Sequence, residues 1–311
     1  MGVMRRTRSL LALATLLLGL ATPYLLSHRE DRVLDEPTRE SLGGDYVRLS
    51  DGVTHYELSG PSGAPVVALI HGGTIPSWNW DPQVPALLGA GFRVLRYDHF
   101  GRGRSDRPEV AYDRALYRRQ LLELLNALEI ERVHLVGISF GGATAASFTA
   151  AHPERVETIA LLAPVLHYAE GKALFGMAAV PGLGEWYARV FSVQNTVDRA
   201  AAFFEESGAD PDYASRFEAQ TRYRGYEQAL LSMSRTDALT DYRETYQALA
   251  EREILLVWGT EDHDIPRTHI DHLRQILRGH RYTELDGAGH GLNIQQSEAI
   301  NRLLLDFLER P

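Results

Sequence analysis

Gly137-Ile138-Ser139-Phe140-Gly141-Gly142 is the stretch that decides the fold of this chain of 311 residues. It follows the apolar run Val133–Val136 and precedes the small-residue segment Ala143–Ala151. A strand, a sharp turn and a helix are therefore predicted, and the flanking glycines allow the close approach that such a turn requires. The turn would lift the Ser139 hydroxyl out of the sheet and place the Phe140 N–H at a helix start, where it can bind an oxyanion. An ordinary tight turn that contains a serine is the alternative.

The composition limits the classes of function. Apolar residues make up 44% and charged residues 23% of the chain, as in ordinary globular proteins. The formal net charge of −9 argues against nucleic-acid binding. No cysteine is present, which excludes disulfides, thiolate metal sites and cysteine nucleophiles. The histidines are scattered without a His-Glu-x-x-His motif, so we expect neither a metal nor another cofactor.

Residues 1–30 resemble a targeting segment. Arginines at positions 5, 6 and 8 precede the uncharged run Leu10–Leu26, and polar residues follow it. This is the order of a secretory signal peptide, and an uncleaved membrane anchor is the alternative. We expect a protein that is exported or tethered through residues 10–26, with its catalytic part outside the cytoplasm. Residues 31–43 are predicted to be a linker, so a chain that starts near Asp31 should be soluble and fully active.

Apolar runs and helical patterns alternate along the rest of the chain. The turn signal Ser50-Asp51-Gly52 separates Asp45–Leu49 from Val53–Leu58 and predicts a β-hairpin. Buried strands are predicted at Pro65–Ile70, Arg93–Tyr97, Val133–Val136, Val156–Leu162, Ile254–Trp258 and Tyr282–Leu285. Helices are predicted at Val84–Ala90, Asp113–Leu128, Gly142–His152, Thr268–Leu277 and Ile294–Leu308. This alternation predicts an α/β fold, with a mostly parallel, doubly wound sheet and an N-terminal antiparallel hairpin.

One long insertion interrupts this alternation. Residues 165–252 show helical periodicity and many aromatic residues but no strand-like run. We expect a helical cap over the carboxyl edge of the sheet, between two core segments at 44–164 and 253–311. Most of its aromatic residues should pack inside the cap. The residues predicted to contact substrate are Trp78, Phe175 and Trp186.

A serine nucleophile requires a base and an orienting acid. His290 lies in a glycine-rich loop between the last predicted strand and the last helix, where small neighbours leave the ring room to move. The loop after Ile254–Trp258 offers Glu261, Asp262 and Asp264 as the acid. We predict Asp262, because its spacing from the flanking glycine and proline lets the loop fold back toward His290.

The chain order Ser139, Asp262, His290 resembles that of the α/β-hydrolase-fold serine hydrolases. The resemblance covers nearly all of residues 45–311. It implies a Ser-Asp-His triad on an α/β-hydrolase fold with a helical cap. This fold is used for many reactions, so the resemblance leaves the substrate open.

Two further motifs support the same resemblance. His71-Gly72-Gly73-Thr74 is similar to the oxyanion turn of the family. The resemblance implies that the N–H groups of Gly73 and Phe140 form the oxyanion hole, with Thr74 as a substitute for Gly73. Asp98 and Arg102 resemble family residues that hold loops together, so we assign them a structural role.

The cap resembles that of esterases and monoacylglycerol lipase-like enzymes. We expect hydrolysis of small carboxylic esters with short-to-medium apolar acyl groups, through an acyl-enzyme. One alternative on the same triad is a carbon–carbon bond hydrolase of ring-cleavage products, in which arginines would hold a carboxylate. The candidates for that role are Arg222, Arg224 and Arg235. A proline iminopeptidase, with Glu205 and Glu206 holding an amino terminus, is a further alternative. A protein that only binds ligands would not need an activated serine.

Overall fold

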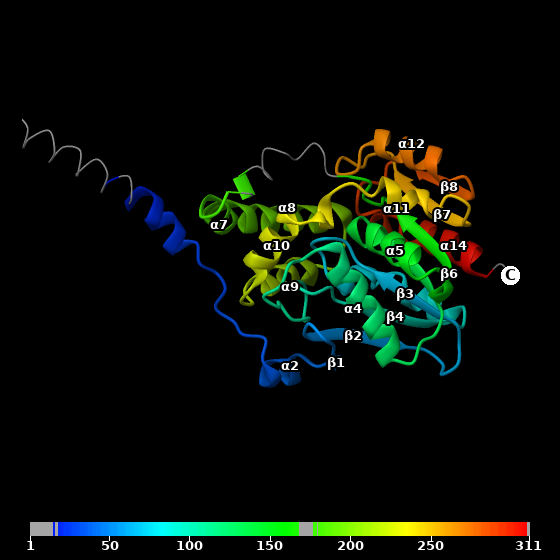
Figure 1. Cartoon of the computed structure of the whole chain (residues 1–311), viewed down its shortest axis with the longest axis horizontal. Coiled ribbons are helices and arrows are strands. Elements are labelled where there is room, and N and C mark those ends of the chain that lie inside the picture. The colour runs from blue at the N-terminus through cyan, green and yellow to red at the C-terminus, as the bar shows by residue number, and fades with distance from the viewer. Residues whose placement is uncertain (1–14, 16–17, 168–176, 179, 310–311) are drawn as a thin grey trace, which may run out of the picture.

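The fold is built around one eight-stranded sheet (Figure 1). The structure is a computed structural model, and it describes residues 15, 18–167, 177–178 and 180–309. The strands are β1 (Asp45–Arg48), β2 (Val53–Ser59), β3 (Val66–Ile70), β4 (Arg93–Tyr97), β5 (Val133–Ile138), β6 (Val156–Leu162), β7 (Ile254–Gly259) and β8 (His280–Leu285). Their order across the sheet is β1-β2-β4-β3-β5-β6-β7-β8.

The directions of the strands follow the sequence prediction. β1 and β2 form an antiparallel hairpin, and β2 also runs antiparallel to β4. The other neighbours are parallel. Every residue of β3 and β7 is buried, which explains their continuous apolar sequences, because parallel strands are covered on both faces. The predicted α/β class and the N-terminal hairpin are confirmed.

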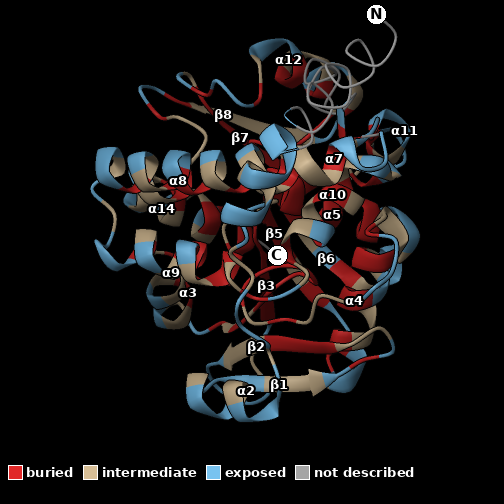
Figure 2. Cartoon of the chain, turned by 90° about the vertical axis from the view of Figure 1, so that its left-hand side faces the viewer, coloured by how far each residue is buried: buried red, intermediate tan, exposed pale blue. Residues whose placement is uncertain are grey.

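Helices cover both faces of the sheet. On one face α3 (Val84–Gly89) packs beside α14 (Ser297–Leu308). The other face carries α4 (Arg114–Ala127), α5 (Phe140–Ala151), α11 (Arg243–Gln247) and α12 (Arg267–Ile276). Figure 2 shows that buried residues concentrate on the strands between these two layers.

The segment between β6 and β7 forms the predicted helical cap. Its described helices are α7 (Leu183–Tyr187), the π-helical turn η3 (Ala188–Ser192), α8 (Val193–Ser207), α9 (Asp212–Thr221) and α10 (Tyr226–Arg235), followed by the short turn η4 (Asp237–Leu239). α8 and α9 pack together through Phe204, Tyr213 and Phe217, which are all buried. These three aromatic residues pack inside the insertion together with Trp78 from outside it, whereas Tyr226 lies under Arg102 of the core.

Residues 31–43 are more ordered than the predicted linker. They contain the helix α2 (Glu36–Leu42). Asp35 caps this helix, because its side chain accepts a hydrogen bond from the Thr38 N–H (3.1 Å). A capping aspartate followed by a proline in the first turn is a helix-start signal that the sequence prediction did not use.

The predicted helix over 294–308 is divided in two. The backbone of Gln296 is not helical (φ −129°, ψ 49°) and separates α13 (Leu292–Gln295) from α14. Asn293 Nδ2, in α13, donates a hydrogen bond to the carbonyl oxygen of Asn79 (2.7 Å). This contact between residues distant in the sequence holds α13 apart from the line of α14.

The N-terminal segment packs against the cap. Residues 18–26 are helical, and Trp186 Nε1 donates a hydrogen bond to Leu20 O (2.8 Å). Glu30 accepts hydrogen bonds from the N–H groups of Gly225 (3.0 Å) and Glu227 (2.7 Å) at the start of α10. Removal of residues 1–30 would therefore delete contacts to the cap, a cost that the sequence prediction omits.

The predicted targeting segment is covered only in part, since residues 1–14, 16 and 17 lie outside the described residues. Within the described ranges, we find no helix with both the length and the apolar character needed to cross a bilayer.

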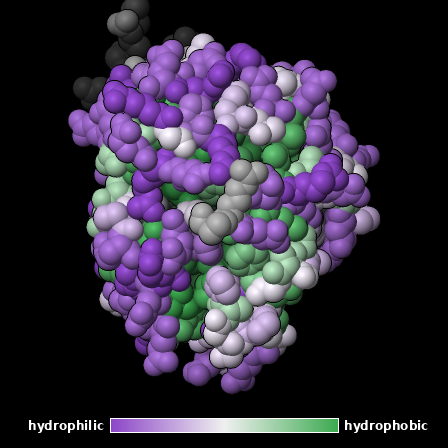
Figure 3. Space-filling view, turned by 90° about the vertical axis from the view of Figure 1, so that its right-hand side faces the viewer, coloured by the Kyte–Doolittle hydropathy of each residue, from purple (hydrophilic) through white to green (hydrophobic). Residues whose placement is uncertain are grey.

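On the face near the C-terminus, hydrophilic residues form most of the surface, and hydrophobic residues show in patches nearer its centre (Figure 3).

Replacing Glu30 should weaken the contact between the N-terminal segment and the cap. Glu30→Ala removes a carboxylate from two N–H groups at a helix start, so the free energy of unfolding should fall by about 1 kcal/mol. Chemical unfolding of both proteins measures this difference. Glu40→Ala, at an exposed position of α2, is the control and should change stability by less than about 0.5 kcal/mol. A loss no larger than that of the control would contradict the capping role.

Candidate active site

Ser139 occupies a strained turn between β5 and α5. Its backbone has a positive φ (φ 55°, ψ −122°), which costs energy in a residue other than glycine. The neighbouring glycines allow this turn, because a Cβ on Gly137 would overlap the Gly141 carbonyl and a Cβ on Gly141 would overlap the Ile70 carbonyl. Ser139 is 6% exposed, so its hydroxyl lies at the end of β5 in a nearly enclosed position.

His290 and Asp262 form a hydrogen-bonded pair on the loops that follow β8 and β7. His290 Nδ1 lies 2.9 Å from Asp262 Oδ2. Asp262 Oδ1 accepts hydrogen bonds from the N–H groups of Asp264 (2.9 Å) and Ile265 (2.8 Å). The Asp262 side chain is fully buried, so the carboxylate is held in one orientation. The second ring nitrogen of His290, Nε2, remains available for proton transfer.

The other two acids of this loop are placed differently. Asp264 is 47% exposed and pairs with Arg199 of α8 (3.0 Å), and Glu261 is also exposed. The structure therefore brings Asp262, among the three acids of the loop, into hydrogen-bonding contact with His290. Between the described residues Ser139 and His290, no hydrogen bond is formed. Hydrogen bonds of this kind often shorten only when a substrate is bound.

The surroundings of His290 favour its protonated form. Burial of the ring lowers its pKa, but the hydrogen bond and the negative charge of Asp262 outweigh burial, and Asp264 adds to their effect. The pKa of His290 is therefore raised above its usual value. A raised pKa makes the imidazole a stronger proton acceptor once the pH is high enough for it to be neutral.

Two backbone N–H groups next to Ser139 have no hydrogen-bond partner within the described part of the chain. Gly73 follows β3, and a Cβ placed on it would lie 3.7 Å from Phe140 Cβ, so the turn packs directly against the start of α5. Neither the Gly73 N–H nor the Phe140 N–H donates a hydrogen bond to another described residue. The first N–H groups of a helix have no partner inside it. Two free donors beside a serine are what an oxyanion hole requires.

Buried side chains hold the turn that carries Gly73. His71 Nδ1 donates to Gly72 O (2.7 Å), and His71 Nε2 accepts from the His99 N–H (2.9 Å). Burial lowers the pKa of His71 to about 4, so the ring is neutral, as the acceptor role of Nε2 requires. Arg102 Nε donates to Gly73 O (2.5 Å). Both side chains support the backbone of this turn.

Asp98 joins three separate segments of the chain. Its Oδ1 accepts from the Ser77 N–H (2.9 Å), and its Oδ2 accepts from His55 Nδ1 (2.9 Å) and the Arg104 N–H (2.8 Å). Burial opposes ionisation of this carboxyl, but the His55 ring and these hydrogen bonds outweigh it and lower the pKa of Asp98. Asp98 thus has the loop-holding role that the sequence predicts.

The cap helices close over the site. Phe203 of α8 lies against Gly291 in the histidine loop, where a Cβ would overlap its ring. Gln220 of α9 donates from Nε2 to Thr74 O (3.0 Å). Met233 of α10 lies beside the oxyanion turn. The sequence prediction counted Phe203 among the cap aromatic residues but singled out none of these three as site residues, because an amphipathic helix gives no sign of which side chain will reach a distant loop.

Of the three residues predicted to contact substrate, two pack against other protein residues and one lies outside the described residues. Trp78, in η1 (Ser77–Trp80), is 8% exposed, and its ring centroid lies 4.6 Å from that of Tyr213 in the cap. Trp186 lies in α7 beside Phe191 and contacts the N-terminal segment. Phe175 is outside the described residues. Contact of these three residues with substrate stays a prediction.

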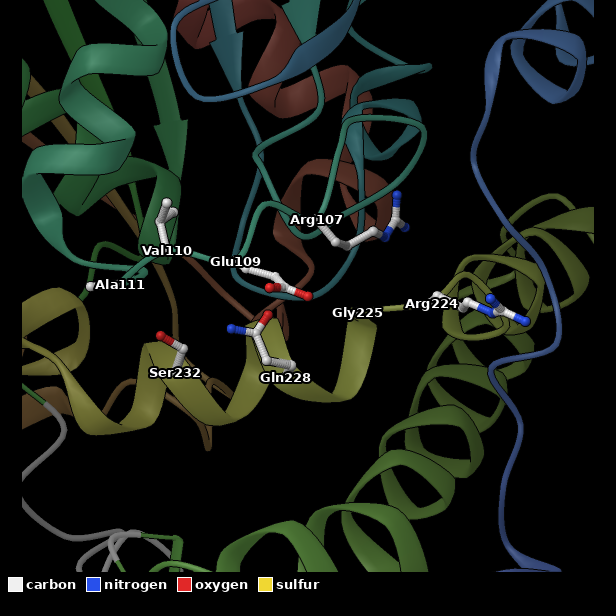
Figure 4. Close-up of a pocket in the computed structure, with 8 residues that line it drawn as sticks. All are labelled: Arg107, Glu109, Val110, Ala111, Arg224, Gly225, Gln228 and Ser232. Carbon is white, nitrogen blue, oxygen red and sulfur yellow. The ribbon is translucent and has the colours of Figure 1, made fainter.

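A polar pocket of about 650 Å³ lies between residues 107–111 and α10 (Figure 4). The Glu109 carboxylate and the Gln228 amide point toward each other in it, whereas the guanidinium groups of Arg107 and Arg224 point away. Arg224, one of the arginines considered for holding a carboxylate, lines this pocket, whereas the predicted triad, oxyanion and substrate-contact residues do not. Among the residues that the structure describes, no group of three or more His, Asp or Glu is placed to hold a metal ion.

A comparison with protein families finds one family over most of the chain. The family model described as "alpha/beta hydrolase fold" matches residues 65–296, a range that includes Ser139, Asp262, His290 and the cap. The chain belongs to the α/β-hydrolase fold family. The family therefore matches the one expected from the order of the sequence motifs.

Known α/β-hydrolase relatives include two curated hydrolases and a solved structure. The 2-hydroxy-6-oxo-6-phenylhexa-2,4-dienoate hydrolase of Comamonas testosteroni is 28% identical, over 84% of this chain and 93% of the relative. The 2-hydroxy-6-oxo-2,4-heptadienoate hydrolase of Pseudomonas putida is 30% identical, over 79% and 90%. The enol-lactonase of Burkholderia xenovorans LB400 has a TM-score of 0.73 and 26% identity, over 86% of this chain and all of the lactonase.

Removing the charge of Asp262 should lower the pKa of His290 in this α/β-hydrolase. Asp262→Asn deletes the charge that outweighs the effect of burial, and NMR titration of the His290 ring measures the result. Asp264→Asn should lower the pKa by a smaller amount, since this exposed carboxylate acts only through its charge. The same His290 pKa in the wild type and in Asp262→Asn would contradict the pairing.

Proposed function

We propose that this protein is a serine hydrolase in which Ser139 attacks a carbonyl carbon. In this proposal His290 is the base, Asp262 orients it, and the N–H groups of Gly73 and Phe140 bind the oxyanion. The observation that carries the proposal is the buried Asp262 carboxylate, which is fixed by two backbone N–H groups and lies 2.9 Å from His290 Nδ1. A carboxylate held in this way fixes the tautomer that leaves His290 Nε2 free to accept a proton.

The proposed reaction has two halves. Ser139 Oγ bonds to the carbonyl carbon while His290 Nε2 takes the hydroxyl proton, and the carbonyl oxygen becomes an anion held by the two N–H groups. The leaving group then departs with the proton from His290, which leaves an acyl-enzyme. In the second half, a water molecule attacks the acyl carbon in the same way and releases the acid and Ser139.

Two classes of bond fit this chemistry. The names of the two curated relatives refer to dienoates, and the comparisons therefore favour a carbon–carbon bond hydrolase of ring-cleavage products over an esterase. The enol-lactonase, in contrast, is named for a cyclic ester. A dienoate carries a carboxylate, which a cationic side chain facing the substrate would bind most strongly.

Two of the three arginines considered for holding a carboxylate have acidic partners, and the third, Arg224, lines the pocket at Glu109 with its guanidinium pointing away from it. Arg222 pairs with Asp31, and Arg235 pairs with Glu185 (2.8 Å). Arg102, next to the oxyanion turn, directs its N–H groups at two backbone carbonyls and a methionine sulfur. Because these cations are already engaged, we propose a neutral ester or lactone as the first candidate substrate and a ring-cleavage acid as the second.

Apolar contacts support the same choice. The cap side chains Phe203 and Met233, which lie against the histidine loop and the oxyanion turn, are both uncharged. Glu205 and Glu206, the acids considered for holding an amino terminus, are exposed at the end of α8. We therefore place short-to-medium acyl esters ahead of peptides.

A substrate series separates these candidates. We expect kcat/KM for nitrophenyl esters to rise up to about fourfold per methylene until the pocket is full, since each buried methylene contributes ~0.8 kcal/mol. Ser139→Ala should lower the rate by up to ~10⁶-fold. The same series includes a lactone, a vinylogous diketone acid and a proline anilide. A preference for the diketone acid would select the second candidate, and a preference for the anilide would indicate a peptidase.

The rate should fall as the pH decreases through the pKa of His290, because a protonated imidazole cannot accept the Ser139 proton. Since this pKa is raised above 6.5, the midpoint of kcat/KM against pH should lie above 6.5. Asp262→Asn should lower the plateau by about 10⁴-fold, whereas Asp264→Asn should stay close to wild type. A rate that decreases with rising pH over this range would require a different chemistry.

A further inference from the structure

The carbonyl groups of the oxyanion turn are each held by a different side chain. Gly72 O accepts from His71 Nδ1 (2.7 Å), Gly73 O accepts from Arg102 Nε (2.5 Å), and Thr74 O accepts from Gln220 Nε2 (3.0 Å). A peptide unit is planar, so holding Gly72 O directly fixes the Gly73 N–H, whereas holding Gly73 O and Thr74 O fixes the N–H groups of Thr74 and Ile75. Two of these three donors come from the core, and the third comes from the cap helix α9.

Gln220 uses both ends of its side-chain amide. While Nε2 donates to Thr74 O, its Oε1 accepts from the Gly103 N–H (2.9 Å), in the loop that also carries Arg102. The residue is 3% exposed, so water does not replace these partners. One glutamine of the cap therefore joins the oxyanion turn to the loop whose arginine holds Gly73.

The helix that carries Gln220 is fixed at its other end as well. Tyr213, in the first turn of α9, donates from its hydroxyl to Asp81 Oδ2 (3.0 Å), directly after η1. Tyr213 also packs on Trp78. α9 is thereby fastened to the segment that follows the oxyanion turn, and Gln220 lies where this helix meets the turn.

We propose that Gln220 is a positioning residue for the oxyanion hole: by anchoring the Thr74 end of the turn to the cap, it restrains the two glycine units before it and with them the Gly73 N–H. The inference rests on the proposed function, in which this N–H binds the oxyanion. Gly72 and Gly73 have no side chains to restrict rotation of the turn. Its orientation therefore depends on the three hydrogen bonds to its carbonyls, and loss of the Gln220 bond frees the Thr74 end.

Two variants separate the two roles of the amide. Gln220→Glu keeps an acceptor for the Gly103 N–H but replaces the donor to Thr74 O with a second acceptor. Gln220→Met has similar length and removes both hydrogen bonds. Gln247→Glu makes the same chemical change at an exposed position of α11 and is the matched control. Circular dichroism and thermal melting identify the folded variants, and Gln220→Met decides the outcome if Gln220→Glu is not folded.

Each variant is tested with the best neutral ester and with a phenylboronic acid, whose tetrahedral adduct on Ser139 resembles the transition state. Misplaced oxyanion donors weaken binding of the transition state more than binding of the substrate. We expect kcat to fall at least about tenfold, KM to change less than about twofold, and the boronic acid to bind at least about tenfold more weakly. Gln247→Glu should match wild type in all three.

The results distinguish this inference from the proposed function. If wild type hydrolyses the ester and Ser139→Ala does not, the result supports the proposed function. If wild type hydrolyses no ester, both the proposed function and the inference are contradicted. If wild type is active but folded Gln220 variants bind the boronic acid as tightly as wild type, the inference alone is wrong. A rise in KM with unchanged kcat would also overturn it, because that result indicates altered substrate binding and not a displaced oxyanion hole.

Discussion

The close approach of α5 to the ends of β3 and β5 is the constraint on which the rest of the structure depends. Glycines at 137 and 141 make it sterically feasible, and Ser139 adopts a backbone that costs on the order of 1–3 kcal/mol. The parallel pairing of β5 with β3 and β6, buried on both faces, offsets this cost. The serine hydroxyl is therefore held by the sheet itself.

The cap is part of the same construction. The oxyanion turn contains two glycines, so the direction of its N–H groups depends on partners elsewhere, and one of these partners, Gln220, comes from α9. Buried polar groups are nearly always paired. A displacement of α9 would leave Thr74 O and the Gly103 N–H without partners. Covering the site and ordering its backbone are therefore linked in this protein.

Local signals in the sequence predicted the strands, the turn at Ser139 and the loop positions of Asp262 and His290, because glycine spacing and apolar runs act over a few residues. Contacts across long distances in the chain were not predictable in this way. Trp78 is an apolar residue beside the oxyanion turn, yet its ring packs on Tyr213 of the cap. Gln220 is one polar residue in an amphipathic helix, and Glu30 caps a helix almost two hundred residues away.

The central claim is that Ser139 is a nucleophile activated by His290 and Asp262. The most direct test is reaction of the folded protein with a fluorophosphonate, followed by peptide mass spectrometry to locate the label. We predict one modified residue in the wild type, Ser139, with no labelling of Ser139→Ala and slow labelling of Asp262→Asn. Labelling at another residue, labelling that persists in Ser139→Ala, or an unlabelled wild type would contradict the account.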